Sequence, residues 1–94
     1  MRFDAGSTDI PTAGSAVQIS NTSDRVKSIS VQGDRDNTGN VYFGVSDVSA
    51  TNGWEMAPGE DKTVNFGEGS VLFSKFYVDA ATNGDDVNWS VILA

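Results

Sequence analysis

The feature of this sequence that most constrains its fold is a period-two alternation of apolar and polar residues in short runs. Successive side chains of a β-strand point to opposite faces, so residues two apart share a face. Val41, Phe43 and Val45 have this spacing, and the run 87–93 repeats it over four apolar residues. No stretch of the chain keeps a helical period of apolar residues. The sequence therefore predicts an all-β chain.

Turn residues separate these runs and set the number of strands. Pro58-Gly59 is typical of a type II turn, because proline presets the first central φ and glycine accepts a positive one. Asn83-Gly84 predicts a β-hairpin. The run 71–78 is apolar on both faces, interrupted by Ser74 and Lys75, and this predicts one strand covered on both sides. About seven to eight short strands indicate a small antiparallel β-sandwich or barrel, jelly-roll-like in outline.

The 94 residues leave room for one domain and no second core. Residues 1–14 are rich in Gly, Ser, Thr, Asp and Pro, with Phe3 and Ile10 as their large apolar groups. They predict an N-terminal arm or a loosely held first strand, followed by a β-sandwich domain over residues 15–94. We expect deletion of the arm to leave the domain folded.

The last predicted strand, 86–93, is open to two interpretations. It carries no lysine or proline, the residues that commonly guard an exposed strand edge. Ile92 lies on the face opposite Trp89, so apolar groups emerge on both sides of this strand. The strand is either internal to a sheet or a free edge that docks on a neighbour.

Histidine and cysteine are both absent. Histidine is the commonest general base and transition-metal ligand, and cysteine supplies thiolate nucleophiles and zinc ligands. Without them, hydrolysis by a catalytic triad and zinc chemistry have no residues to use. We therefore expect a protein that is not an enzyme and that holds no cofactor.

The net charge is −7 and is unevenly placed along the chain. Residues 1–35 sum to zero, so the whole excess of negative charge belongs to residues 36–94. An acidic chain repels phosphate backbones, so nucleic acid is not an expected partner. No segment is apolar over the length of a bilayer, and the N-terminus lacks the apolar stretch of a secretory signal. We expect no membrane partner and synthesis in a cytosol.

Acidic turns are the candidates for a cation site. The segment 34–39 resembles the start of a calcium loop, with oxygen ligands at alternate positions and a glycine. Val45 stands where an EF-hand needs its glutamate, so a solvated turn is the favoured interpretation. Asp85 and Asp86, with Asp79 before them, could share a cation, but adjacent strand residues point to opposite faces. Turn solvation is favoured there too, and no metal site is predicted.

The aromatic residues offer candidates for contact. Trp89 lies on the most apolar face of its strand, which predicts core packing. Trp54 falls in a predicted loop and is the best candidate for an exposed contact. The alternatives stay open: Trp54 anchors a protein interface or plugs its loop, or it joins Trp89, Tyr42 and Tyr77 in a platform for a sugar.

A series of motifs resembles those of small bacteriophage virion structural proteins. In that family the chain begins with a strand, an Asn-Thr-Gly turn and a second strand that ends in glycine. A loop comes next, followed by an apolar-x-Pro-Gly-Glu turn and a strand that carries a Tyr-Val pair. The corresponding residues here are Asn37–Gly44, Val48-Ser49 with Gly53, Met56–Glu60 and Phe76–Ala80.

The resemblance covers roughly residues 15–93 and implies a head decoration (capsid cement) or other minor virion protein. It implies a β-sandwich located in the virion, with the major capsid protein or other virion proteins as partners. It also implies a homo-oligomer, with a trimer favoured, and it carries no catalytic residues. A carbohydrate-binding or adhesive module of a tail or capsid surface is the alternative. For the interface we predict Phe3, Ile10, Trp54 and Ile92.

Overall fold

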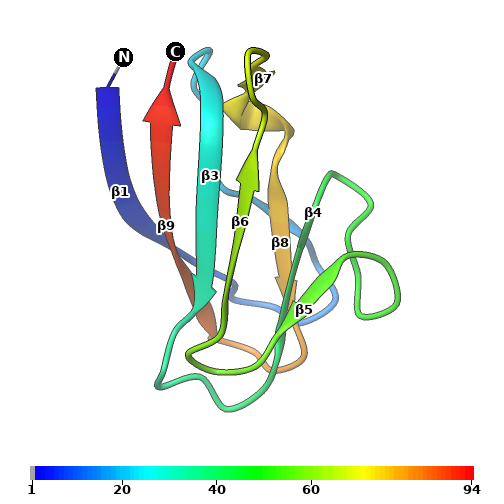
Figure 1. Ribbon diagram of the computed structural model, residues 1–94. Helices are drawn as coiled ribbons and strands as arrows, with labels where there is room; N and C mark the ends of the chain where they lie inside the picture. Colours follow the sequence, from blue (N-terminus) through cyan, green and yellow to red (C-terminus); the bar gives the residue numbers. More distant parts are fainter. Residues whose placement is uncertain (1) are drawn as a thin grey trace.

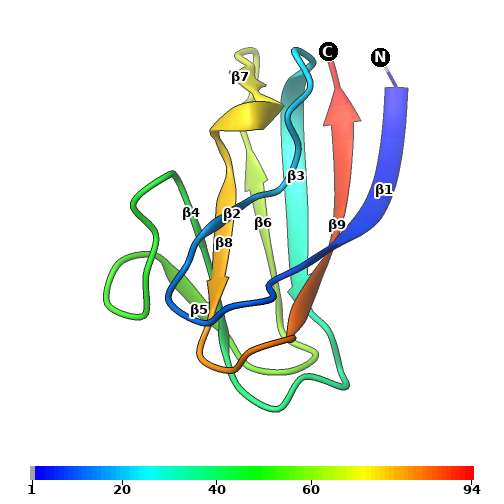
Figure 2. The same ribbon diagram turned by 180° about the vertical axis from the view of Figure 1, so that it is seen from behind.

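The computed structural model describes residues 2–94 and has nine strands in two layers (Figures 1 and 2). Both ends of the chain lie at the same end of the molecule, beside the start of the third strand. The elements are β1 (Arg2–Asp9), β2 (Val17–Gln18), β3 (Arg25–Gly33), β4 (Val41–Gly44), β5 (Trp54–Met56), β6 (Asp61–Asn65), β7 (Val71–Leu72), the 3-10 turn η1 (Phe73–Lys75), β8 (Tyr77–Ala80) and β9 (Asp86–Leu93).

The strands form two antiparallel sheets that pack face to face. The five-stranded sheet has the order β1-β9-β3-β6, with β7 pairing the start of β3. The four-stranded sheet has the order β2-β8-β4-β5. The two sheets do not close into a barrel. The prediction of an all-β antiparallel sandwich is confirmed, and of the two predicted forms the sandwich is the one adopted.

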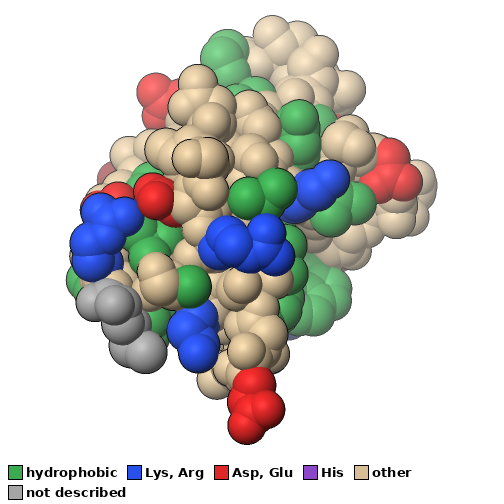
Figure 3. Space-filling view, turned by 90° about the horizontal axis from the view of Figure 1, so that it is seen from above, with side chains coloured by type: hydrophobic (Ala, Val, Ile, Leu, Met, Phe, Trp, Pro, Cys, Tyr) green, Lys and Arg blue, Asp and Glu red, His purple; other side chains and the backbone are tan. Residues whose placement is uncertain are grey.

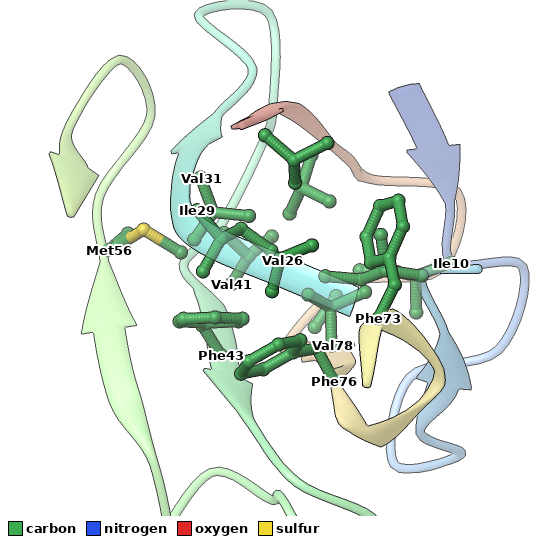
Figure 4. Packing of buried hydrophobic residues seen from close by; sticks show 14 of the residues in the cluster. Ile10, Val26, Ile29, Val31, Val41, Phe43, Met56, Phe73, Phe76 and Val78 are labelled. Atoms are coloured by element: carbon green, nitrogen blue, oxygen red, sulfur yellow. The ribbon is translucent and has the colours of Figure 1, made fainter. Parts of the chain in front are cut away.

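The period-two pattern places the core between the sheets. Ile29 and Val31 of β3 pair with Val91 and Trp89 of β9, so these side chains share the inner face. Their neighbours in sequence, among them Ser30, lie on the outer face. Figure 4 shows side chains of both sheets meeting in the middle layer. The buried cluster consists of Ile10, Ile19, Val26, Ile29, Val31, Val41, Phe43, Met56, Phe73, Phe76, Val78, Ala80, Val87, Val91 and Leu93.

The last strand, β9, is internal, because it lies between β1 and β3. The free edge beside it belongs to β1, in the segment predicted as an arm. All eight residues of β1 pair with β9, from Arg2 opposite Leu93 to Asp9 opposite Asp86. Residues 2–9 therefore form the edge strand of the five-stranded sheet, and seven of its eight residues are exposed.

The predicted single strand 71–78 is wrong in its middle. The chain there forms β7 on the five-stranded sheet and β8 on the other, with η1 between them. The chain therefore crosses between layers at this point, and an uninterrupted strand cannot do so. Phe73 turns into the core, where its ring meets that of Trp89 edge-on at 5.2 Å.

The two predicted turns differ in outcome. At Pro58-Gly59 the Glu60 N–H donates to the Ala57 carbonyl at 2.9 Å and Gly59 has φ +85°, as predicted. Gly84 also has a positive φ, +84°, but the predicted hairpin is wrong because β8 and β9 belong to different sheets. The Asn83-Gly84 turn instead lies in the connection that takes the chain from β8 in one sheet to β9 in the other.

Candidate functional site

An apolar hollow opens between the free edges of the two sheets, on the side where β5 and β6 lie. It has a volume of about 250 Å³. Two of its lining residues, Val45 and Trp54, are 52% and 46% exposed and stand beside it. We call it the aromatic hollow. Its lining consists of Phe43, Gly44, Val45, Gly53, Trp54, Val64 and Phe76.

Strand pairing places the rings of the aromatic hollow. Phe43 on β4 lies opposite Trp54 on β5, with ring centroids 6.2 Å apart and planes at 52°. Phe43 stacks on Phe76 at 5.6 Å, and Phe76 stacks on Phe66 at 6.0 Å. Trp54 therefore lies on an edge strand and not in the predicted loop. Its exposure agrees with the prediction of an accessible ring, while its role in contact stays a prediction.

Glycine shapes one wall of the aromatic hollow. Gly53 has φ +141°, a conformation that side-chain-bearing residues rarely adopt. A Cβ there would stand 2.6 Å from Cγ2 of Val48 and 2.9 Å from the carbonyl oxygen of Phe43. The loop can therefore close on β4 only with glycine at this position. The resulting wall is backbone and small side chains, which leaves room beside the Trp54 ring.

A second exposed apolar feature lies on the opposite edge of the five-stranded sheet. Phe3 on β1 is paired with Ile92 on β9, and both side chains face outward. They are 72% and 37% exposed. We call this pair the Phe3–Ile92 patch. Two of the four predicted interface residues thus lie side by side, and Trp54 stands apart from them.

The fourth predicted interface residue, Ile10, is not at the surface. Its side chain is 0% exposed and belongs to the core cluster. Its N–H donates to the carbonyl of Asp85 at 2.9 Å, and its carbonyl accepts from the N–H of Gly84. The prediction that Ile10 contacts a partner is therefore corrected, because the residue anchors the end of β1 under the β8–β9 turn.

Two of the acidic residues are buried and bind backbone groups, contrary to the prediction of solvated turns. Asp85 is 6% exposed, and its two oxygens accept the N–H groups of Thr38 and Gly39, each at 3.0 Å. Asp79 is 2% exposed, and its Oδ1 accepts from Gly14 and from Ala80. Charge-assisted hydrogen bonds of this kind hold loops in place. Both carboxylates therefore have a structural role, because each one accepts hydrogen bonds from the backbone of a loop or strand end.

Further acidic groups gather at the end of the molecule away from the termini. Asp86 faces Asp9 across the β1–β9 pair, and Asp34 donates its N–H to the Asp86 carbonyl. Burial raises the pKa of the Asp86 carboxyl, and the charge of Asp34, a hydrogen bond with it, and the charges of Asp9 and Asp85 raise it further. In the segment resembling a calcium loop, Asp34 instead accepts the N–H of Asp36. Residues 2–94 contain no group of three acidic, histidine or cysteine side chains placed to share a metal ion.

The comparisons with known proteins add no relative. No protein-family model matches the chain, and no curated protein matches it in sequence. Over the described residues, no helix is long and apolar enough to span a membrane. The described surface carries two exposed apolar sites, the aromatic hollow and the Phe3–Ile92 patch, on opposite edges of the sandwich.

Proposed function

We propose that this chain is a bacteriophage virion structural protein, a capsid decoration (cement) protein that docks on the head as a homo-oligomer and stabilises it. The observation that carries the proposal is the aromatic hollow, where core rings are reachable from the surface and Trp54 and Val45 stand exposed beside it. Exposed apolar groups gathered around a hollow are typical of a protein interface. The resemblance of residues 15–93 to small virion proteins supplies the kind of partner.

The mechanism proposed for this protein is mechanical. Apolar surface covered on docking contributes about 25 cal/mol per Å², so a few buried side chains give a modest affinity per contact. Copies repeated around a particle then bind together, and the linked contacts raise the overall avidity. A sandwich whose loops are tied by Asp79 and Asp85 carries such contacts with little ordering cost.

The partners in this proposal are the major capsid protein or other virion proteins, together with further copies of the chain. The protein is made in the host cytoplasm and resides in the virion. No chemical step is part of the role, and neither cofactor nor nucleic acid takes part in it.

A carbohydrate-binding or adhesive module is the second candidate, and the exposed ring of Trp54 is the observation that favours it. Sugars stack on such rings but also need side chains that hydrogen-bond their hydroxyls. The aromatic hollow is lined by apolar residues and glycine, which favours a protein partner. Titration of a Trp89→Phe variant with a glycan panel decides the point: a change in Trp54 fluorescence supports the module, and an unchanged spectrum counts against it.

The experiment that tests the proposed function is the copy number of the chain in purified particles, by quantitative mass spectrometry against the major capsid protein. A ratio near one, or a simple fixed fraction, is expected for a decoration protein. A handful of copies per particle would place the chain at a vertex, neck or tail. Absence from particles would overturn the proposal.

A further inference from the structure

We infer that copies of this chain bind one another head to tail, with the Phe3–Ile92 patch of one copy seated in the aromatic hollow of the next. The inference rests on the homo-oligomer of the proposed function and names the contact that builds it. It concerns self-association of the purified chain. The chain can therefore be present in particles without this contact, and the contact can form in a chain that is absent from particles.

The distribution of exposed apolar groups carries the inference. Among the residues that the structure describes, the large hydrophobic side chains left exposed are Phe3, Val45, Trp54 and Ile92. They fall into two groups, one on the β1 and β9 surface and one at the β5 side. One contact between the two groups covers all four side chains. A contact of the aromatic hollow with a second hollow would leave Phe3 in water at 72% exposure.

The sizes of the two sites match. Phe3 projects from an edge strand, so its ring is free to enter a recess. A cavity of about 150 Å³ with apolar walls already takes up benzene. The aromatic hollow, at about 250 Å³, has room for a phenyl ring and part of an isoleucine. The rings of Phe43, Trp54 and Phe76 offer a phenyl group stacked or edge-on neighbours.

The charges near the aromatic hollow permit contact between two acidic chains. The chain as a whole carries −7. Within two positions of the lining residues there are two acidic and two basic side chains, which sum to zero. These are Asp47, Glu55, Lys62 and Lys75.

The Phe3–Ile92 patch lies at the less acidic end of the molecule. Arg2 and Asp4 flank Phe3, and Lys27 lies with Ile92 at a shallow hollow on the same face. Figure 3, seen from this end, shows lysine and arginine side chains gathered there. The acidic groups around Asp86 lie at the other end. Repulsion between two copies therefore falls mainly outside the inferred contact.

The inferred contact joins two different sites and is therefore heterologous. A patch that binds a different site on the next copy is heterologous, and such contacts close into a ring when the rotation between copies allows it. The two sites lie on opposite edges of one sandwich, so each copy has one neighbour on each side. The same contact can therefore be repeated from one copy to the next.

Sedimentation equilibrium of the full chain over a concentration series tests the contact. The parent is expected to associate into dimers and larger assemblies as its concentration rises. Phe3→Lys and Val45→Lys are each expected to weaken association by about tenfold or more, since a charge at a fully covered contact is costly. Matched controls are Ser7→Lys, on the same face of β1, and Thr51→Lys, in the loop of Val45; both should assemble as the parent does. Circular dichroism checks that each variant is folded.

Mixing the two variants separates this contact from a two-fold one. The Phe3→Lys chain keeps its hollow and the Val45→Lys chain keeps its patch, so a one-to-one mixture should form a heterodimer that neither forms alone. Because the chain has no cysteine, Phe3→Cys and Val45→Cys mixed under mild oxidation should give the mixed disulfide ahead of either homodimer. A monomer at every concentration, a Phe3→Lys chain that assembles normally, or no preference for the mixed disulfide would overturn the inference.

Discussion

Asp85 holds the β3–β4 turn by two hydrogen bonds, to the N–H groups of Thr38 and Gly39. Asp85→Ala removes the acceptor of two part-buried hydrogen bonds, so we expect a loss of about 1–3 kcal/mol in the free energy of unfolding. Urea denaturation measures it. Asp36→Ala, at an exposed position of the same turn, serves as the control and should change stability by less than about 0.5 kcal/mol. Equal losses in the two variants would contradict this role of Asp85.

Asp86 makes stability depend on pH. Its pKa in the folded protein lies above the ordinary value of 3.8, so between the two values the folded state binds more protons than the unfolded state. Stability therefore falls as pH rises through this window and stays lower above it. Asp86→Asn keeps a group that can donate to Asp34 and removes the charge facing Asp9.

The Asp86→Asn variant should be more stable than the parent at pH 7 by about 0.5 kcal/mol, the size of one cross-strand like-charge pair. The difference should vanish as pH falls below the ordinary pKa. Thermal unfolding from pH 3 to 8 follows it, with Asp47→Asn in an exposed loop as the control. A variant less stable than the parent at pH 7 would show that the charge at Asp86 is favourable.

At the scale of elements, β1 depends on its close approach to a tryptophan. A Cβ at Gly6 would stand 2.7 Å from Cζ2 of Trp89, whose ring is fixed by Phe73 and by a hydrogen bond from its Nε1 to Thr8. Gly6→Ala should therefore cost about 1–3 kcal/mol through overpacking. Ala5→Val, which adds more volume on the outer face, should be nearly neutral. Urea denaturation gives the free energy of unfolding of the two variants. Equal losses of stability would contradict the close packing of Gly6 against Trp89.

The alternation of apolar residues predicted the elements whose two faces differ. β3 and β9 have one inner and one outer face, and both were predicted with the correct inward residues, among them Ile29, Val31 and Val91. The run 71–78 has apolar residues on both faces and is interrupted only by Ser74 and Lys75, so alternation could not reveal that the chain turns at Phe73 and changes sheet. A run that is apolar on both faces is compatible with either arrangement.

The exposed apolar sites were only partly predictable from the sequence, because they depend on which strands become neighbours. Exposure of Phe3, Trp54 and Ile92 agrees with the residues chosen, but Ile10 is buried because the β8–β9 turn folds over it. The aromatic hollow joins β4, β5 and β6, and its existence depends on which strands form the edges of the two sheets. Strand order is a property of long-range pairing that local patterns do not specify.

At the scale of the whole molecule, the N-terminal segment and the sandwich form one packed body. Ile10→Ala removes a fully buried side chain and should cost about 2–5 kcal/mol, whereas Ile92→Ala at the surface should cost much less. Deletion of residues 1–14 should destabilise the fold, contrary to the expectation for a free arm. Thermal unfolding of the three variants measures this. A deletion variant as stable as the parent would restore the arm interpretation.

The central claim is that this protein works by burying two exposed apolar sites in contacts with other protein chains. Hydroxyl-radical footprinting of the free chain and of the chain in purified particles measures that burial directly. We predict strong protection of Phe3, Trp54 and Ile92 in particles, with the exposed Asp36 turn unchanged. Equal labelling of all three side chains in both states, or protection confined to the acidic end, would contradict the account.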